Sequence, residues 1–414
     1  MTTPTSRSAD AAPTPHVSLD SAAPAADAAV PAAPQPGEGA SASGAAPDAG
    51  ETRGSATTAL RGRLLDVFLI TLVGGVVRVA LLNYMARENG DNLWGLLTKW
   101  DAAQYLTIAT EGYVQDDKFA FFPAFPMLMR LTGALGLDPT VGGMILNVGF
   151  LMLMCLGAME LARRMGAGYR GQLATAILVA CAPMSIVFNM TYTEPLFGAL
   201  TFWALVAMHD RQWVRAGVLV FLLGFVRLTA VDVIATFAVW VLLYGRKDWR
   251  AWVALVLSPL SLIGFITWVN MHLPKGYFQL QKDGWGSSFD MGKSTLEYLK
   301  HTIVKNSDVQ YLITSAAIVG VVVALVYAWR RMPAVVWVFV FMLAANILLS
   351  SGIMSSRPRL LLPAIIVYMP LFVQLVEGRW GRDHPLKAWA VVALWVLVGA
   401  WISAYMLAIF EYAI

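Results

Sequence analysis

The sequence is poor in charged residues and in cysteine. Asp, Glu, Lys and Arg make up 14% of the 414 residues, whereas a soluble domain has about a quarter. The two cysteines, Cys155 and Cys181, both lie within apolar runs, which excludes a disulfide framework and a cysteine metal site. We expect both thiols to be packing residues.

Metal-binding motifs and internal repeats are missing as well. His272 and His301 are isolated, no spacing of His, Cys and carboxylates is typical of a zinc or two-metal site, and Asp-x-Asp does not occur. We therefore expect no metal and no other cofactor. The long loops fall at unrelated positions in the two halves, unlike the paired broken helices of many secondary transporters.

Apolar side chains dominate the chain. Hydrophobic residues make up 58% and the mean hydropathy is +0.62, which predicts an all-α polytopic membrane protein surrounded by membrane lipids. The net charge of +4 does not indicate nucleic acid as a partner, because the basic residues form short clusters between apolar runs. We expect about eleven spans, at residues 64–82, 139–162, 172–189, 195–208, 214–227, 230–244, 251–271, 309–328, 334–351, 359–376 and 388–408.

Residues 1–60 consist mostly of Ala, Pro, Gly, Ser and Thr, and are predicted to form a disordered cytoplasmic tail. The start of the chain lacks the basic-then-apolar pattern of a cleavable signal peptide, so we expect the first span to stay as an anchor. Arg53, Arg61 and Arg63 precede that span and place the N-terminus in the cytoplasm. Residues 61–414 then form the transmembrane domain, with exoplasmic loops at about 83–138 and 272–308.

The charged residues of the other loops agree with this alternating path. The short loops predicted to be cytoplasmic hold Arg163, Arg164, Arg170, Arg211, Arg215, Arg246, Lys247, Arg250, Arg330, Arg331, Arg379, Arg382 and Lys387. The predicted outer loops hold Asp91, Asp101, Glu111, Asp116, Asp117, Glu194, Asp283, Asp290, Glu297 and Asp308, mixed with some Lys and Arg, so the strong basic bias is on the inner side. The alanine-rich, cysteine-poor composition favours a bacterial plasma membrane.

The first outer loop contains the best candidate for an active site. The stretch from Trp100 to Pro126 starts with Asp101 on a short amphipathic run rich in aromatic residues, which is typical of a helix lying on the membrane surface. The apolar run 119–137 is interrupted by prolines, an arginine and glycines, so it is predicted to be an interfacial or dipping element and not a span. Asp101 is either a reactive carboxylate or a surface acid.

Several motifs resemble those of the PIG-V mannosyltransferases. They are Trp100-Asp101-Ala102, Ile108-Ala109, Gly112-Tyr113 and the run from Phe119 to Pro126, then Tyr192-Thr193-Glu194 with Leu196-Phe197, Arg227-Leu228-Thr229, and Arg357-Pro358-Arg359 with Pro363. The resemblance runs from about residue 64 to the end. It implies a GT-C-type integral-membrane enzyme that takes mannose from a polyprenyl-phosphate-mannose donor without a metal, as family members do when they add the second mannose of the GPI anchor.

This chemistry gives the candidate residues definite roles. Asp101 is the candidate general base for an acceptor hydroxyl in a one-step displacement that inverts the anomeric carbon. Asp116 and Asp117 are the fallback bases. Arg227, Arg357 and Arg359 are candidates for holding the donor phosphate; alternatively they extend to lipid headgroups. The candidate substrate-binding residues are Trp100, Tyr105, Lys118, Glu194 and Trp285, although the aromatic ones also suit an interfacial belt and Glu194 suits a helix start.

Three hypotheses about function follow. The first is a mannosyltransferase that acts on the exoplasmic face, with a glycolipid or another hydroxyl compound as acceptor. The second is a transporter or flippase of lipid-linked glycans, which would use the same membrane body. The third is a GT-C enzyme with a different sugar or a protein acceptor.

Overall fold

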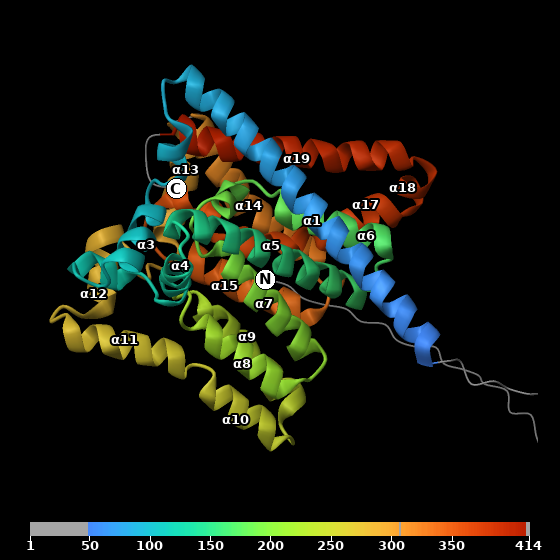
Figure 1. Cartoon of the computed structure of the whole chain (residues 1–414), viewed down its shortest axis with the longest axis horizontal. Helices are drawn as coiled ribbons and strands as arrows, with labels where there is room; N and C mark the ends of the chain where they lie inside the picture. Colours follow the sequence, from blue (N-terminus) through green and yellow to red (C-terminus); the bar gives the residue numbers. More distant parts are fainter. Residues whose placement is uncertain (1–48, 306–307, 411–414) are drawn as a thin grey trace, which may run out of the picture. The chain divides into compact units, whose positions relative to one another are not determined.

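A computed structural model describes residues 49–305 and 308–410, with side chains from residue 60 onward. Among the described residues the regular secondary structure is helical, apart from one β-bridge between Phe289 and Ser350. Its α-helices are α1 Ala49–Glu88, α2 Leu93–Leu97, α3 Asp101–Thr110, α4 Ala124–Ala134, α5 Pro139–Arg164, α6 Tyr169–Ala180, α7 Glu194–His209, α8 Trp213–Leu223, α9 Ala230–Trp240, α10 Trp249–Leu257, α11 Leu260–His272, α12 Gly276–Trp285, α13 Lys293–Val304, α14 Val309–Ala328, α15 Ala334–Leu348, α16 Arg357–Leu360, α17 Met369–Glu377, α18 Arg379–Asp383 and α19 Pro385–Ala408 (Figure 1).

Tighter or wider helical turns connect several of these helices. They are η1 Asp116–Ala120, η2 Ser185–Asn189, η3 Val241–Gly245, η4 Met354–Ser356 and η5 Leu362–Tyr368. Most of the predicted disordered tail, residues 1–60, lies outside the described residues. Its described end, from Ala49, is the start of helix α1.

Five described helices are long and apolar enough to cross a membrane. They cover Leu60–Glu88, Pro139–Arg164, Trp249–His272, Val309–Ala328 and Pro385–Ala408. A sixth candidate is the pair Met354–Leu360 and Leu362–Glu377, which is bent by 59°. The chain is therefore a multi-pass membrane protein, but the predicted count of eleven spans is not confirmed.

Proline explains where predicted spans are broken. The prediction of one helix over 172–189 is wrong, because α6 ends at Ala180, Pro183 follows, and Met184 has a φ of 68° before η2 starts. The span predicted at 251–271 corresponds to the candidate span Trp249–His272, in which a short break at Pro259 separates α10 from α11. A proline removes a backbone donor and clashes with the preceding turn, so an apolar run that contains one does not form a regular helix.

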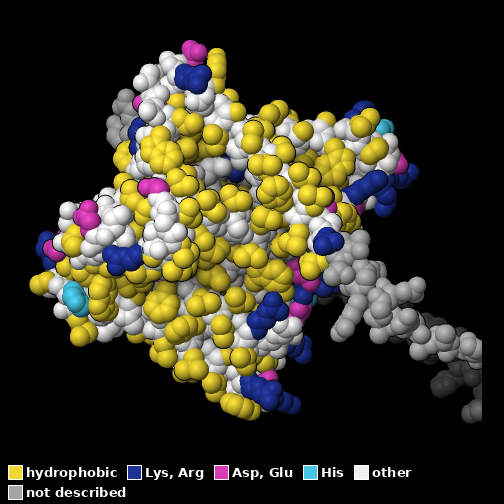
Figure 2. All heavy atoms as spheres, viewed as in Figure 1, with side chains coloured by type: hydrophobic (Ala, Val, Ile, Leu, Met, Phe, Trp, Pro, Cys, Tyr) yellow, Lys and Arg dark blue, Asp and Glu magenta, His cyan; other side chains and the backbone are white. Residues whose placement is uncertain are grey.

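Contacts between distant segments gather the predicted cytoplasmic loops at one end of the helices. The Tyr169 hydroxyl donates to Asp66, Arg164 pairs with Asp210, and the Gly168 N–H donates to Glu377 Oε2 over 2.9 Å. These contacts bring together the start of α1, the α5–α6 and α7–α8 turns and the end of α17. Figure 2 shows Lys and Arg side chains around α18, at the upper right of the view, and near α10, at its bottom.

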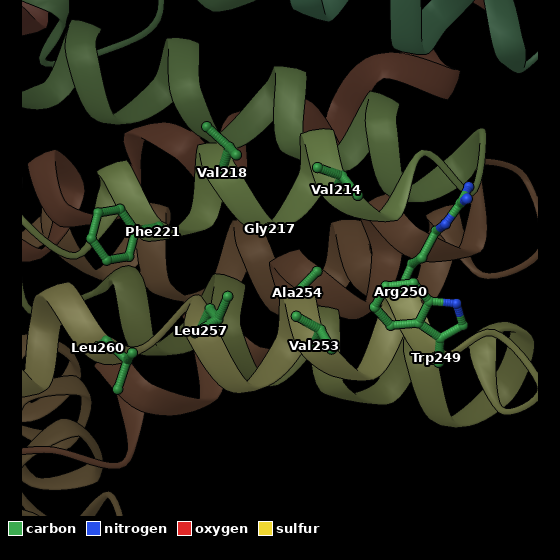
Figure 3. A pocket seen from close by; sticks show the side chains of 10 residues that line it. All are labelled: Val214, Gly217, Val218, Phe221, Trp249, Arg250, Val253, Ala254, Leu257 and Leu260. Carbon is green, nitrogen blue, oxygen red and sulfur yellow. The ribbon is translucent and has the colours of Figure 1, made fainter.

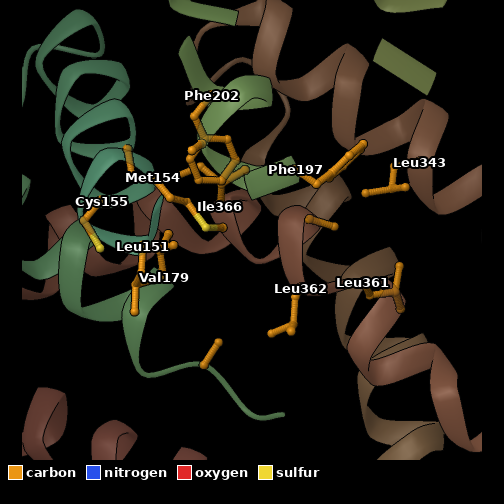
Figure 4. Close-up of a cluster of buried hydrophobic side chains, with 14 of the residues drawn as sticks. Leu151, Met154, Cys155, Val179, Phe197, Phe202, Leu343, Leu361, Leu362 and Ile366 are labelled. Atoms are coloured by element: carbon orange, nitrogen blue, oxygen red, sulfur yellow. The ribbon is translucent and has the colours of Figure 1, made fainter. Parts of the chain in front are cut away.

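The core lies where α5, α7 and η5 meet. Met154 of α5, Phe197 and Phe202 of α7 and Ile366 of η5 are buried and pack together (Figure 4). A Cβ at Gly157 would lie 2.9 Å from that of Phe202, so glycine is needed for this close approach of α5 and α7. The core fixes the position of α7, whose first residue, Glu194, belongs to the candidate site.

Arg78 connects helix α1 to this core. Its guanidinium is 2% exposed and donates to Asn189 Oδ1 over 2.9 Å, to the Ala180 carbonyl over 2.6 Å and to Ser185 Oγ over 3.2 Å. These three hydrogen bonds hold the guanidinium inside the protein, away from lipid headgroups. It satisfies polar groups that the break between α6 and η2 leaves inside the membrane.

We expect Arg78→Met to destabilise the protein by about 2–5 kcal/mol, because three buried polar groups lose their donor and a methionine supplies none. The midpoint of thermal unfolding in detergent measures the effect. Arg61→Met is the matched control, since Arg61 lies on the same helix and is exposed. Equal midpoints for the two variants would show that the buried hydrogen bonds do not stabilise the fold.

Candidate active site

Asp101 is the first residue of α3 and follows a strained turn. Trp100, which precedes it, has φ 60° and ψ −125°, a backbone conformation that is uncommon for a bulky residue. The turn connects α2 to α3 and places Asp101 at a helix N-terminus, where the helix dipole favours a negative charge. The Asp101 side chain is 24% exposed.

Four charged side chains from four segments form a row that begins at Asp101. Arg359 of α16 donates from Nη1 to Asp101 Oδ2 over 2.5 Å, and its Nε lies 3.7 Å from Glu194 Oε1. Arg227, between α8 and α9, lies 3.0 Å from the same Glu194 oxygen through Nη1. We call Asp101, Arg359, Glu194 and Arg227 the charged row.

The positive and negative charges of the charged row balance, and its side chains are mostly buried. It has two acids and two arginines, and Glu194 is 2% exposed while Arg359 is 10% exposed. The guanidinium of Arg359 lies 5.1 Å from the ring centroid of Tyr192, and that of Arg227 lies 5.6 Å from the ring of Phe197. Removing one member would leave an opposite charge without its partner in a poorly solvated place.

Arg357, two residues before Arg359, contacts different groups. Its Nη1 donates to Thr295 Oγ1 over 2.8 Å and to the Ile347 carbonyl over 2.6 Å, and its Nη2 donates to the Ser350 carbonyl. The guanidinium thus joins α16 to the end of α15 and to α13. Most of its donors are used in this way, so Arg357 is better placed to support the site than to hold an anion.

A cavity of about 270 Å³ opens between these segments. Its charged lining residues are Asp101, Arg227, Arg357 and Arg359. Its neutral polar lining residues are Thr229, Gln281, Ser287, Asn346, Ser350, Ser351 and Ser356. Amides and hydroxyls are suited to the hydroxyl groups of a sugar or polyol, while arginines are suited to phosphate.

Asp232 fixes the amide of Asn346. Asn346 Nδ2 lies 3.0 Å from Asp232 Oδ1 and 3.1 Å from Oδ2. Asp232 is 4% exposed and lies on the first turn of α9. Because a carboxylate only accepts hydrogen bonds, the pair assigns the amide nitrogen to Asp232 and leaves the Asn346 oxygen as an acceptor for another group.

Aromatic residues of the outer loops line the rest of the cavity. Tyr105 of α3 packs edge-on against Phe121 at a centroid distance of 5.3 Å, and Phe121 packs edge-on against Trp285 at 5.7 Å. Burial raises the pKa of Tyr105 well above its ordinary value, with the nearby Asp101 charge acting in the same direction. The Tyr105 hydroxyl therefore stays neutral and keeps its proton at physiological pH.

The structure brings some predicted site residues together and separates others. Asp101, Tyr105, Arg227, Trp285, Arg357 and Arg359 line the cavity. Glu194 lies behind the two arginines of the charged row. Trp100 and Lys118 do not line the cavity. Lys118 is buried, and its Nζ lies 2.8 Å from Asp117 Oδ2. The fallback base Asp117 is therefore paired with a lysine and does not line the cavity either.

Asn346 and the serines before α16 are lining residues that sequence reasoning missed. The run Ser350-Ser351-Gly352-Ile353-Met354-Ser355-Ser356 interrupts two apolar stretches directly before Arg357. Polar residues in that position are a signal that a membrane-depth segment lines a cavity, because lipid would not satisfy its backbone. In the part of the chain whose side chains are described, no three His, Cys, Asp or Glu residues are placed to hold a metal ion.

The fold is similar to that of a solved membrane protein. The crystal structure of ArnT from Cupriavidus metallidurans bound to undecaprenyl phosphate superposes with a TM-score of 0.53, over 83% of this chain and 77% of that chain, at 13% sequence identity. The predicted fold class, an all-α membrane protein with a GT-C-type fold, is thereby confirmed.

The sequence comparisons then identify the family it resembles. The sequence model of the family "Mannosyltransferase (PIG-V)" matches residues 78–246. GPI alpha-1,6-mannosyltransferase 2 of Mus musculus is 31% identical over 148 residues, which cover 33% of this chain and 30% of the mouse protein. The human protein of the same name is 30% identical over 145 residues, covering 32% and 29%.

The resemblance to the PIG-V mannosyltransferases is confirmed for part of the chain. The matches span about a third of the length of these relatives, so they leave most of each relative unmatched. The matched range 78–246 contains Asp101, Glu194 and Arg227. Arg357 and Arg359 lie beyond it, and only the tertiary structure brings Arg359 to Asp101.

Proposed function

We propose that this protein is an inverting mannosyltransferase that moves mannose from a polyprenyl-phosphate-mannose donor to a hydroxyl acceptor. One observation carries the proposal: Asp101, in the motif that resembles PIG-V enzymes, shares a cavity with Arg227 and Arg359. Transfer from a phosphate leaving group requires a base that takes the acceptor proton and cations that stabilise the departing phosphate. A carboxylate and two guanidiniums supply these groups. The family and the fold are consistent with this activity.

Asp101 acts as the general base in this proposal. The acceptor oxygen attacks the anomeric carbon of mannose, its proton passes to the Asp101 carboxylate, and the bond between that carbon and the phosphate oxygen breaks. Attack from the side opposite the phosphate inverts the anomeric carbon. A base within hydrogen-bond reach of the attacking hydroxyl contributes about 10²–10⁴-fold to the rate.

Arg227 and Arg359 hold the donor phosphate. A phosphate bound between them competes with Asp101 for Arg359, which turns the carboxylate toward the acceptor hydroxyl. The negative charge that develops on the departing polyprenyl phosphate is then stabilised by both guanidiniums, which are fixed in advance by Glu194. Arg357 positions α16 through its bonds to backbone carbonyls.

The neutral polar residues that line the cavity bind hydroxyl groups of the mannose or of the acceptor. Asn346 offers an acceptor oxygen, and the serines before α16 offer hydroxyls that donate or accept. Trp285 and Tyr105 supply apolar faces on which a sugar ring packs. An acceptor that brings several hydroxyls, such as the headgroup of a glycolipid, suits this wall.

The site faces the exoplasmic side in this proposal. The basic loops gather at the opposite end of the helices from Asp101, and the positive-inside rule assigns such an end to the cytoplasm. An N-terminus in the cytoplasm follows from the arginines before the first span. Both substrates then reach the cavity from the outer leaflet, where each lipid tail stays in the membrane.

A transfer assay tests the function. The purified protein is incubated with labelled polyprenyl-phosphate-mannose and native membranes, and we expect a labelled product that is not formed without the protein. Movement of the intact donor across proteoliposome membranes without any new glycosidic bond would overturn the proposal in favour of a flippase. If the protein transferred another sugar and did not use the mannose donor, the sugar assigned to the donor would be wrong.

We expect Asn346→Leu to weaken sugar or acceptor recognition. The leucine is of similar size but cannot accept a hydrogen bond, so KM for one of the two substrates should rise about 10-fold or more, which corresponds to one lost buried hydrogen bond. Steady-state transfer rates at varied donor and acceptor show which substrate is affected. An unchanged KM for both would remove Asn346 from the binding wall.

A further inference from the structure

An apolar groove of about 450 Å³ lies between α8 and the span that α10 and α11 form together. It is lined by Val214, Val218 and Phe221 of α8 and by Val253, Leu257 and Leu260 of the facing span (Figure 3). The two helices approach closely at its floor, where a Cβ on Gly217 would lie 2.7 Å from that of Ala254. Val218 is 54% exposed and Leu257 is 50% exposed, so the groove is open toward the lipid that surrounds the helices.

An arginine and a tryptophan lie at one end of the groove. Arg250 and Trp249, on the first turn of α10, are at the end that Val214 lines, and Phe221 and Leu260 are at the other end (Figure 3). The Arg250 guanidinium lies 6.0 Å from the centroid of the exposed Trp249 ring. Arginine and tryptophan at the end of an apolar surface are typical of the depth at which lipid headgroups begin.

The Arg250 end of the groove has an excess of positive charge. Four more basic residues lie just before α8, on its first turn or just before α10, and they are Arg211, Arg215, Arg246 and Lys247. In the part of the chain whose side chains are described, none of these five cations lies within ion-pair distance of a carboxylate. The two acids nearby are engaged, because Asp210 pairs with Arg164 and Asp248 accepts the backbone N–H of Arg250. An anion from outside the chain therefore suits this end of the groove.

The groove is about as long as one membrane leaflet is thick. Its α10–α11 side runs from Trp249 to Leu260, about 17 Å at the rise of an α-helix. Half of the hydrocarbon thickness of a bilayer is about 15 Å. A lipid whose phosphate lies at Arg250 can therefore lay one acyl chain along the groove as far as the middle of the membrane.

Two other occupants suit the groove less well. The lipid phosphate of the proposed reaction binds beside Asp101, and the cavity there has no lining residue in common with the groove. A second copy of the chain would have the same orientation in the membrane. Its basic residues would then meet those around Arg250 at the same depth, and like charges placed face to face repel each other.

We propose that the groove between α8 and the α10–α11 span binds an anionic phospholipid of the leaflet at the basic end of the protein, with its phosphate against Arg250 and one acyl chain over Val253 and Leu257. The inference does not depend on the proposed function. The α10–α11 span needs such support, since 28% of its most apolar stretch is buried. The acyl chain adds apolar contact between this span and α8, and the charge at Arg250 selects an anionic headgroup.

The choice of headgroup is tested with two lipids that have the same acyl chains. The purified protein is titrated with dioleoyl phosphatidylglycerol or dioleoyl phosphatidylcholine, and native mass spectrometry gives both affinities. We expect tighter binding of the anionic lipid, and Arg250→Gln should lower this preference about fivefold. Arg382→Gln is the control, because Arg382 is an exposed arginine of α18 at the same end of the helices, and it should leave the preference unchanged.

The position of the acyl chain is tested with two substitutions on α10. Val253→Trp fills the middle of the groove, and we expect about tenfold weaker binding of phosphatidylglycerol. Val256→Trp is the matched control: it places the same ring on the same helix, at a position that is 65% exposed and does not line the groove. Phosphatidylglycerol should raise the unfolding midpoint of the Val256→Trp variant as much as that of the unsubstituted protein, and that of Val253→Trp less.

Crosslinking of the unsubstituted protein gives a measurement that does not depend on a variant. A phosphatidylglycerol with a photoreactive group on one acyl chain should label residues between 214 and 221 or between 249 and 260. Labelling confined to other helices would overturn the inference, and so would equal affinity of the unsubstituted protein for the two lipids or an equal loss with Val253→Trp and Val256→Trp.

Two further results would assign the groove to another occupant and also overturn the inference. One is binding of undecaprenyl phosphate that Val253→Trp abolishes and phosphatidylglycerol does not displace. The other is a dimer that Val253→Trp dissociates. None of these measurements uses a sugar donor, so their outcome is separate from that of the transfer assay.

Discussion

Asp101→Asn is expected to lower the rate of mannosyl transfer by at least about 10²-fold, because the amide cannot accept the acceptor proton. The substitution preserves the shape of the side chain and leaves an oxygen to accept the hydrogen bond from Arg359. We therefore expect normal expression, an unchanged unfolding midpoint and nearly normal donor binding. Single-turnover transfer from labelled polyprenyl-phosphate-mannose separates the chemical step from binding.

Asp117→Asn is the matched control for this experiment. Asp117 lies in the same outer loop, carries the same charge and is half-exposed beside Lys118. It should retain full transfer activity. If Asp101→Asn kept normal turnover while Asp117→Asn lost it, the base would be the fallback acid and the role assigned to Asp101 would be wrong.

Arg359→Gln is expected to reduce both donor binding and turnover. The guanidinium supplies charge-assisted hydrogen bonds to the phosphate and stabilises the leaving group, so we expect about 10²–10³-fold lower turnover and about tenfold or greater loss of undecaprenyl phosphate affinity. The change also leaves Asp101 and Glu194 without a shared cation. Arg359→Lys should recover part of the affinity, because it restores the charge but not the fork of donors.

Arg382→Gln provides the comparison, since Arg382 is an exposed arginine of α18 at the basic end of the helices. It should change neither quantity. Size-exclusion chromatography and the unfolding midpoint of Arg359→Gln show whether the protein still folds. A folded Arg359→Gln variant with normal donor affinity and normal turnover would remove the arginine from the phosphate site.

The two neighbouring arginines show what a motif does not specify. The sequence singles out Arg357 and Arg359 together, as parts of one Arg-Pro-Arg motif that suits phosphate. In the structure the first donates to carbonyls of Ile347 and Ser350, and the second to Asp101. Both arginines line the same cavity, but their hydrogen-bond partners come from different segments of the chain, which the motif does not specify.

The sequence also does not predict how long each helix is. Hydrophobic runs indicate where apolar helices lie, and each predicted span overlaps a helix in the structure. They do not indicate where a helix stops inside the membrane, because buried groups such as Arg78 satisfy the backbone at a break. That compensation depends on residues about one hundred positions apart in the chain.

The sequence by itself determined the class of this protein and its first candidate residue. Few charged residues and long apolar runs predict a helical membrane protein. A local motif is sufficient to single out Asp101. Only the tertiary structure decided which cations meet that carboxylate and which neutral side chains face it. The physical reason is distance along the chain: Arg359 is 258 positions from Asp101, and no local pattern encodes a contact that packing of several helices creates.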